Sequence, residues 1–487
     1  MKTRALLWTI LLLAACKPFE INHLTVEYTA EPMGIDVTAP RFGWQMHSTR
    51  KGAAQQAYQI QVTDDKGTLV WDSGVVADGH SQGILYEGEA LKPRTGYNWS
   101  VTVTDEREKK QTARSFFETS LLSKSDTDPA WNGALWIGGD ASAMPFEPQY
   151  LSVFRLRFSV EADGPAAFLY GAGDWRLSGE HAMKLAFDGR KLTVSREGYP
   201  GEDVSFEYAL PASKGVRNVE LASVSGMTSI TVDGVQVVTG LNLNPAGLGG
   251  DYTAYPELCD IGFEAAEGVS ARFSEIEVQN YRLPRHTLAT VPDVTVSGET
   301  RMVELPRTGL TQLQREFSLD KPVAKARIYM TARGVYDLYM NGVRVSEDYL
   351  NPGLTQYNKT HFYQVYDVTS ALKQGQNTLG AVLGEGWWSG NISFSPENWN
   401  YWGDRQALLG QLIVTYADGS EEAIVTDTSW QWTNDAPCRY GSIFQGEIYD
   451  ATKEASAWKA ACEVPLEEII SHEPAGIGLM SWPAADD

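Results

Sequence analysis

Hydrophobic and polar residues alternate along most of the chain after residue 16, with the period of two that is typical of half-buried β-strands. The alternation is clear at 58–62 (YQIQV), 97–103 (YNWSVTV) and 154–160 (FRLRFSV). Asp-Gly or Asn-Gly pairs, which tolerate positive φ and favour tight hairpins, follow many of these runs. Helical candidates are short, at 368–372 and 466–471. Many short strands with few helices predict an all-β protein built of consecutive β-sandwiches.

Breaks in this pattern predict three sandwiches, at residues 20–122, 140–283 and 298–465. Their edges lie near 126–129 and at Leu283-Pro284, and residues 466–487 are predicted to be a linker. A length of 487 residues agrees with about three domains. No short repeat is visible, so the sequence does not indicate a solenoid or a propeller.

The first 16 residues predict export and a lipid anchor. Lys2 and Arg4 precede a short apolar run, and Leu13-Ala14-Ala15-Cys16 resembles a bacterial lipobox. The apolar run is too short for a permanent membrane span. Cleavage before Cys16 and acylation of its thiol would hold the protein in the cell envelope, in the periplasm or at the outer-membrane surface. An ordinary cleaved signal is the alternative.

The net charge of −22 argues against nucleic acid as a partner, because phosphates require a basic surface. The chain has no Cys-x-x-Cys pair, so a zinc site is not indicated. Cys438 and Cys462 could form a disulfide in an export compartment, but the sequence does not decide this.

Two parts of the chain resemble known modules of one family. The first segment, residues 20–122, contains a series of short sequence motifs in a fixed order: PRFGW (40–44), QAYQIQV (56–62), VWDSG (70–74), LKPRTGYNW (91–99) and FFET (116–119). This set resembles the N-terminal immunoglobulin-like module of bacterial α-L-rhamnosidases, and residues 131–138 are similar to that family's linker. Trp44 and Trp99 lie in strand patterns and are predicted to be core residues.

The third segment, residues 298–465, contains the largest number of family-like motifs. They are ARIYMTARGVY (326–336), LYMNGVRV (338–345), LNPGLTQY (350–357), GEGWW (384–388), GDR (403–405), IVTDTSW (424–430) and GEIYDA (446–451). They resemble the β-sandwich that precedes the catalytic core in α-L-rhamnosidases. The resemblance implies carbohydrate binding, and in some family members calcium-dependent binding of rhamnose.

The second segment interrupts the arrangement familiar from the family and resembles a laminin-G or concanavalin-like jelly roll. Trp175, between Asp174 and Arg176, could form a small sugar platform. A spacer that stiffens the assembly and a second sugar site are both open interpretations.

The strongest candidate for sugar contact is residues 385–405, which hold six aromatic residues interleaved with Ser, Asn, Asp and Arg. A sugar needs an aromatic surface for its C–H face and polar partners for its hydroxyl groups. The alternative is that these aromatic residues only pack the loop onto a sandwich. The predicted carbohydrate-binding residues are Trp387, Trp388, Asn391, Trp402, Asp404, Arg405, Asn341, Glu447 and Tyr449.

Glu447, Tyr449 and Asp450 form a second polar cluster that could hold calcium or serve as a strand-end network. The calcium ligands themselves remain unassigned.

No catalytic residue is predicted. Inverting glycosidases need an acid and a base about 6.5–9.5 Å apart, and the resembled family places them on an (α/α) barrel of long helices, which this sequence lacks. Residues 479–483 resemble the linker toward that barrel. The resemblance therefore implies the N-terminal portion of an enzyme that hydrolyses terminal α-L-rhamnose from plant or microbial glycans. A stand-alone rhamnose-binding surface protein and a structural scaffold are the alternatives. Expected partners are rhamnose-containing glycans and the missing catalytic domain.

Overall fold

The computed structural model describes residues 19–140, 143, 146–213, 215–244, 256–281, 287–390, 392, 400–444 and 446–465, and the backbone of 478–481. These residues form β-strands and the short 3-10 helices η1 (Pro129–Trp131), η3 (Pro148–Tyr150) and η5 (Thr369–Ala371). The predicted all-β class is confirmed. The chain divides into two compact units, one built on the residues up to Lys124 and the other on Ser125–Leu479. Helix η5 falls in one predicted helical segment, and the other, 466–471, lies outside the described residues.

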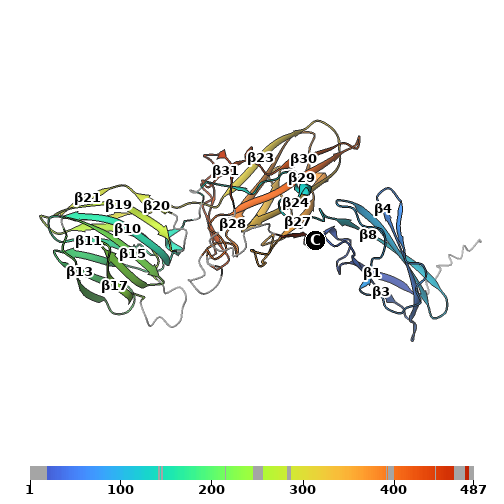
Figure 1. Cartoon of the computed structure of the whole chain (residues 1–487), viewed down its shortest axis with the longest axis horizontal. Helices are drawn as coiled ribbons and strands as arrows, with labels where there is room; N and C mark the ends of the chain where they lie inside the picture. The colour runs from blue at the N-terminus through green and yellow to red at the C-terminus, as the bar shows by residue number, and fades with distance from the viewer. Residues whose placement is uncertain are drawn as a thin grey trace, which may run out of the picture. The chain divides into compact units, whose positions relative to one another are not determined.

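The first unit is a sandwich of two sheets (Figure 1). Its strands are β1 (Glu20–Val26), β2 (Met33–Ile35), β3 (Arg41–His47), β4 (Gln55–Asp64), β5 (Leu69–Asp72), β6 (Ile84–Leu85), β7 (Gly96–Asp105) and β8 (Lys110–Thr119). They form the orders β1-β3-β6 and β2-β8-β7-β4-β5. Trp44 and Trp99 are buried between the sheets, which confirms their predicted place in the core. The Trp44 indole also donates to Oε1 of Gln55 at 2.9 Å, so its polar atom is satisfied inside the sandwich.

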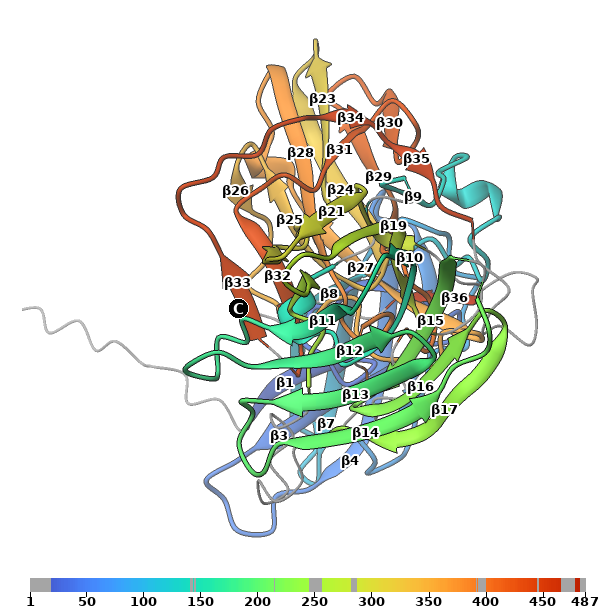
Figure 2. The same ribbon diagram turned by 90° about the vertical axis from the view of Figure 1, so that its left-hand side faces the viewer.

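The inserted sandwich lies in the second unit. Its strands are β10 (Val153–Ala162), β11 (Ala166–Ala172), β12 (Ala182–Asp188), β13 (Lys191–Glu197), β14 (Val204–Ala209), β15 (Val216–Val224), β16 (Met227–Val232), β17 (Val235–Asn242), β18 (Asp260–Ala265), β19 (Ser270–Asn280), β20 (Thr287–Val291), β21 (Val294–Ser297) and β22 (Thr300–Val303). One sheet has the order β14-β13-β12-β11-β18-β22, of which β12, β13 and β14 lie side by side in Figure 2. The other runs β17-β16-β15-β10-β19-β20, with β21 also on β19.

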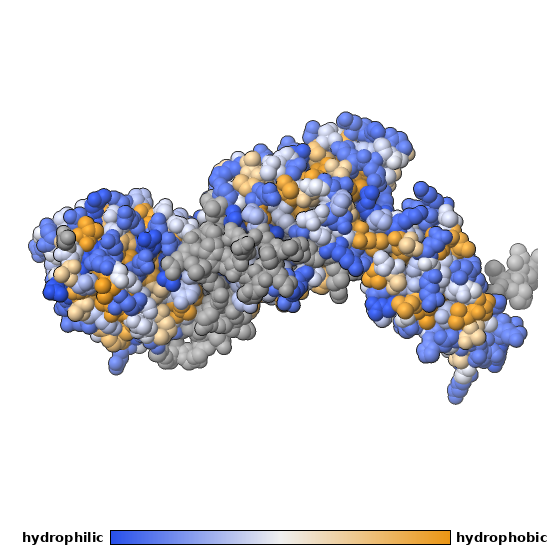
Figure 3. Space-filling view, in the orientation of Figure 1, coloured by the Kyte–Doolittle hydropathy of each residue, from blue (hydrophilic) through white to orange (hydrophobic). Residues whose placement is uncertain are grey.

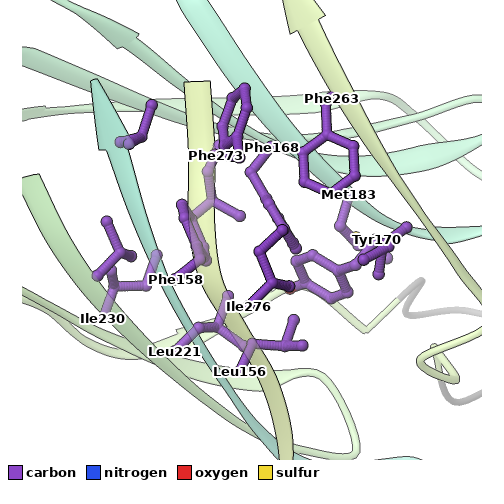
Figure 4. Close-up of a cluster of buried hydrophobic side chains, with 14 of the residues drawn as sticks. Leu156, Phe158, Phe168, Tyr170, Met183, Leu221, Ile230, Phe263, Phe273 and Ile276 are labelled. Atoms are coloured by element: carbon purple, nitrogen blue, oxygen red, sulfur yellow. The ribbon is translucent and has the colours of Figure 1, made fainter. Parts of the chain in front are cut away.

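Phenylalanine side chains fill the space between these two sheets (Figure 4). Phe158 stacks on Phe168 with 4.2 Å between ring centroids, and Phe263 packs on Phe273 at 4.9 Å. The predicted boundary at residue 283 falls inside this sandwich, because β20, β21 and β22 follow it and pair with β19 and β18.

The third sandwich completes the second unit. Its strands are β9 (Ile137–Gly138), β23 (Gln312–Leu319), β24 (Val323–Arg333), β25 (Val335–Met340), β26 (Val343–Arg344), β27 (Thr360–Asp367), β28 (Gly375–Gly384), β29 (Ala407–Tyr416), β30 (Glu421–Val425), β31 (Gln431–Thr433), β32 (Cys438–Ser442), β33 (Gly446–Tyr449), β34 (Lys459–Ala460) and β35 (Cys462–Glu463). The division between the two units falls within the last strand, β36 (Gly478–Ser481). One sheet has the order β26-β25-β28-β23-β31-β34, and the other contains β35-β9-β29-β24-β27.

Strand β9 belongs to the third sandwich although it precedes the inserted one in sequence. Ile137 lies opposite Leu408 of β29, and Gly138 lies opposite Cys462 of β35. The chain therefore forms one strand of the third sandwich first, then the whole inserted sandwich, and then the remaining strands of the third sandwich from β23 onward.

Candidate functional site

The aromatic segment, residues 385–405, connects β28 in one sheet of the third sandwich to β29 in the other. Its described parts are 385–390, 392 and 400–405, and hydrogen bonds join the two halves. The amide of Gly390 donates to Oδ1 of Asn400 at 2.7 Å, and the amide of Asn400 donates to the carbonyl of Gly390 at 2.9 Å. These paired bonds give the segment a fixed base.

Trp388 is the anchor of this base. Its side chain is only 4% exposed, and its Nε1 donates to the carbonyl oxygen of Arg405 at 2.9 Å. The ring packs edge-on against Tyr357, 5.6 Å away between centroids. A Cβ atom on Gly403 would lie 2.4 Å from the indole, so only glycine allows this close approach. For Trp388 the burial favours the packing alternative over sugar contact.

Three other aromatic residues of the segment keep solvent access. Trp387 and Trp402 are half-buried, and Tyr401 is 38% exposed. The ring of Trp402 stands edge-on to Tyr401 at 5.0 Å and to Tyr357 at 5.8 Å. A partly exposed ring on a packed base is the arrangement that a sugar face requires. Phe394 and Trp399, which belong to the same segment, lie outside the described residues.

A buried cation lies beneath the segment, and the sequence pattern did not indicate it. Arg333 is 3% exposed, and its guanidinium carbon lies 4.3 Å from the ring centre of Trp136 and 5.8 Å from that of Trp388. One of its nitrogens donates to the carbonyl of Val464 at 2.8 Å. Burial, together with the positive charge of Arg333, lowers the pKa of His361 to about 3, so this histidine is neutral.

Glu385 begins the segment and is fully enclosed. Its carboxylate lies against the backbone of Gly390, where an added Cβ atom would come within 2.2 Å of a carboxylate oxygen. Burial raises the pKa of Glu385 to about 8, and a hydrogen bond with Tyr440 opposes the shift. At neutral pH this group is held mainly in its protonated, neutral form.

The remaining predicted residues of the third sandwich fall in different environments. Asp404 is buried, Arg405 is half-buried, and Asn391 lies outside the described residues. Asn341 occupies a turn at φ 53°, where its amide nitrogen donates to Ala371 and its oxygen accepts from the amide of Thr378. Those bonds give Asn341 a role in holding the turn.

Glu447 and Tyr449 lie on β33 and are exposed, Tyr449 by 62%. The neighbouring Asp450 accepts hydrogen bonds from the amide and hydroxyl of Thr452 at 3.0 and 2.6 Å. Among the described residues no group of three acidic, histidine or cysteine side chains lies close enough to hold a metal ion. The hydrogen bonds of Asp450 are those of a strand-end network, and calcium binding by this chain stays a prediction.

Comparison with known proteins identifies the two end domains. Residues 21–123 match the family described as "Rha78A-like, N-terminal immunoglobulin domain", and residues 321–467 match the "Alpha-L-rhamnosidase N-terminal domain". The α-L-rhamnosidase of Streptomyces avermitilis is 31% identical over 481 residues, which cover 90% of this chain and 43% of that enzyme. The chain belongs to the α-L-rhamnosidase family. It carries the family's N-terminal modules, as the sequence predicted.

Two further comparisons agree. An α-L-rhamnosidase of Formosa agariphila is 38% identical over 174 residues, covering 33% of this chain and 18% of that enzyme. The crystal structure of the S. avermitilis α-L-rhamnosidase complexed with L-rhamnose superposes with a TM-score of 0.58 at 26% identity, over 94% of this chain and 46% of that one.

The chain thus spans less than half the length of the S. avermitilis α-L-rhamnosidase that it matches. The elements of its described residues are strands and 3-10 helices, so the long helices of the family's catalytic barrel are not among them. No helix in the described part has the length and hydropathy to cross a bilayer. The face of the molecule seen in Figure 3 is largely hydrophilic, with apolar residues scattered over it.

The three cysteines that the structure describes are free thiols. Cys259 is buried, and Cys438 and Cys462 are half-buried. The disulfide that the sequence left open between Cys438 and Cys462 is not formed.

Proposed function

We propose that this chain is the carbohydrate-binding and positioning part of an α-L-rhamnosidase that removes terminal α-L-rhamnose from glycans. The family membership supports the rhamnosidase assignment. The observation that carries the binding role is the contrast within the aromatic segment. Trp388 is buried and fixes the base, whereas Trp387 and Trp402 keep part of their rings accessible.

Physical chemistry favours sugar contact at this place. The exposed face of an indole offers an apolar surface to the C–H face of a pyranose. The segment also carries amide, carboxylate and guanidinium groups within a few residues, and such groups fix the orientation of hydroxyls. Because the described base of the segment is packed and hydrogen-bonded, little ordering of those base residues would be required upon binding.

Isothermal titration of the full chain with methyl α-L-rhamnoside and a rhamnose-containing oligosaccharide tests the proposal. We expect Trp387→Ala and Trp402→Ala each to weaken binding by about ten-fold, because removing a central aromatic contact costs more than 1 kcal/mol. Tyr349→Ala serves as the control, since Tyr349 is exposed in the same sandwich but outside the segment. Unchanged affinity in both tryptophan variants would favour the scaffold alternative, which the burial of Trp388 supports.

The N-terminal residues add a proposal about location. We propose that Cys16 is lipidated after export, so that the sugar-binding modules act at the cell envelope. The proposal rests on the lipobox-like residues 13–16. These residues lie outside the described part of the chain.

A further inference from the structure

The inserted sandwich and the third sandwich meet at a joint within the second unit. One connecting segment leads from β9 into β10, and another leads from β22 back to β23. The two segments are bound to each other, because the amide of Phe146 donates to Oγ1 of Thr308 at 2.7 Å and the amide of Thr308 donates to the carbonyl of Phe146 at 3.0 Å. A pair of bonded connections between two compact sandwiches is an arrangement that permits a hinge.

An aromatic stack closes this joint. Tyr150 of η3, directly before β10, and Tyr440 of β32 in the third sandwich lie with ring centroids 5.0 Å apart and planes inclined by 14°. Tyr440 is 2% exposed, whereas Tyr150 is half-buried. Beside the stack, Nη2 of Arg439 donates to the carbonyl of Arg307 at 3.2 Å, so β32 is also bound to the second connecting segment. The inserted sandwich thus contacts the third sandwich through Tyr150.

A buried carboxyl group lies beside this stack on the side of the inserted sandwich. Glu257 is 5% exposed, and its segment is bound to η3, since the amide of Cys259 donates to the carbonyl of Pro148 at 2.9 Å. Burial raises the pKa of Tyr150 and of Tyr440, and the negative charge of Glu257 adds to both shifts. This carboxyl group is therefore close to both rings of the stack.

Arg176 faces Glu257 but is held by another carboxylate. Its Nε and Nη2 bind Asp174 at 2.9 and 2.5 Å, and its Nη1 lies 3.7 Å from Oε1 of Glu257. Within the described structure, Oε2 of Glu257 is buried without a hydrogen-bond partner. Cys259 is a further titratable group that faces this carboxyl. Burial raises the pKa of Glu257 to about 8, Arg176 opposes the shift, and Asp174 adds to it.

A second buried carboxyl group lies behind the stack in the third sandwich. Glu385 is 2% exposed, and its Oε2 also has no hydrogen-bond partner in the part of the chain that the structure describes. The titratable side chain that faces it is Tyr440, through a hydrogen bond. Tyr440 therefore contacts Tyr150 on one side and Glu385 on the other, so separation of the stacked rings would bring water toward both carboxyl groups.

The protonation state of these two groups should decide how firmly the joint closes. A buried carboxylate with an unpaired oxygen is unfavourable, whereas water stabilises the ionised form. Both pKa values are about 8 in the closed joint, against the usual 4.5. The stability of the closed joint should therefore be complete below about pH 4.5 and fall as the pH rises to about 8.

We infer that this joint is a proton-dependent latch: with Glu257 and Glu385 protonated, the two sandwiches are held together through Tyr150 and Tyr440, and ionisation lets them separate about their paired connections. The inference goes beyond the proposed function, because it concerns the arrangement of the sandwiches and does not depend on sugar binding. Glu385 also lies against the backbone of Gly390, so the latch is joined to the base of the aromatic segment.

The test measures the separation of the two sandwiches in the full chain. Dyes on non-natural residues at the positions of Met227 and Tyr349, which are exposed on the inserted and the third sandwich, report it by single-molecule energy transfer. Between pH 5.5 and pH 8 the ratio of open to closed molecules should rise at least about ten-fold, because one pKa unit corresponds to a ten-fold change in an equilibrium. The variant that combines Glu257→Gln with Glu385→Gln should keep the ratio within about two-fold.

Matched variants separate the latch from general effects of charge. Glu207→Gln combined with Glu454→Gln removes one exposed carboxyl group from each sandwich and should retain the wild-type response. Tyr150→Ala should open the joint already at pH 5.5, whereas Tyr150→Phe keeps the ring and should behave like the wild type. Far-UV circular dichroism should be the same at both pH values, which distinguishes opening from unfolding.

Four results would each overturn the latch. They are a wild-type separation that does not change with pH, a wild-type response that persists in the double glutamine variant, a joint that stays closed in Tyr150→Ala, and a loss of β-structure that accompanies the opening. The first three would show that the carboxyl groups or the stack do not control the joint, and the fourth would show that a sandwich unfolds instead.

Discussion

Trp388 and Arg405 are joined by a 2.9 Å hydrogen bond from the indole nitrogen to the backbone carbonyl, and this bond ties together the two halves of the aromatic segment. The adjacent Trp387 has the same side chain but is only half-buried. Two neighbouring tryptophans therefore have different physical roles.

Replacement of Trp388 should destabilise the second unit, whereas replacement of Trp387 should not. Trp388→Ala removes a buried indole and leaves a cavity, so we expect a loss of about 3–5 kcal/mol in the free energy of unfolding. Trp387→Ala should cost less than about 1 kcal/mol. Denaturant titrations followed by far-UV circular dichroism measure both. Similar losses for the two variants would contradict the assigned roles.

Glu385 should make the stability of the third sandwich depend on pH. Its folded pKa of about 8 lies above the usual value of 4.5, so the stability associated with its protonated form is complete below about pH 4.5 and is lost as the pH rises through about 8. Glu385→Gln keeps a neutral side chain, and its stability relative to the wild type should therefore improve between about pH 5 and pH 9. Unfolding midpoints across this range provide the measurement.

The exposed Glu454 of the same sandwich gives the control for that pH series. Glu454→Gln is measured in the same series, so that the effect of losing one exposed carboxyl group can be subtracted. After that subtraction, a constant difference for Glu385→Gln would mean that the buried carboxyl titrates normally.

Much of the fold follows from patterns that are local in sequence. Strand alternation predicted the sandwiches, and Trp44 and Trp99 are buried as their strand positions required. The edge of the inserted sandwich was harder to predict, because Leu283-Pro284 is a strong local break although β20 to β22 still pair with strands before it. Such pairing joins residues that are far apart in the sequence, so a local break such as Leu283-Pro284 does not predict it.

The candidate site shows the same division. The high density of aromatic residues indicated 385–405 as a candidate. Alternation of hydrophobic and polar residues predicts burial only in strands, so the sequence could not distinguish buried Trp388 from half-buried Trp387 in this loop. Arg333 also escaped notice, since it lies in a strand and reaches Trp136 and Trp388 only in the folded sandwich. The stack of Tyr150 on Tyr440 joins residues of two sandwiches that no local pattern connects.

Cys259 and Cys438 should react with a thiol reagent at different rates. Burial raises the pKa of Cys259 far above its usual value and that of Cys438 to about 11, and only the thiolate is nucleophilic. In a Cys16→Ser chain, half-buried Cys438 should react slowly, and buried Cys259 should react only upon unfolding. Peptide mapping after timed labelling checks the order. Early labelling of Cys259 would show that its sandwich opens readily.

Lipidation of Cys16 can be tested independently of sugar binding. Cells expressing the full gene should incorporate a labelled fatty acid into the protein, and Cys16→Ser should lose the label and release the protein from membranes. Cys462→Ser serves as the control, because it retains the lipobox-like residues. A mature N-terminus elsewhere than at residue 16, found by mass spectrometry, would contradict the anchor.

Arg176 should be essential for the stability of the loop that presents Trp175. Arg176→Met leaves Asp174 buried without its counter-charge, and breaking such a buried pair costs about 3–5 kcal/mol. Burial raises the pKa of Glu257 to about 8, so this group is neutral near pH 5 and the deficit should be smaller there than at pH 8. Arg157→Met is the matched control: Arg157 forms an exposed ion pair with Glu220, and such pairs contribute about 1 kcal/mol or less. Denaturant titrations of both variants near pH 5 and pH 8 decide the matter, and equal, pH-independent losses would show that Arg176 is not the internal cation of this loop.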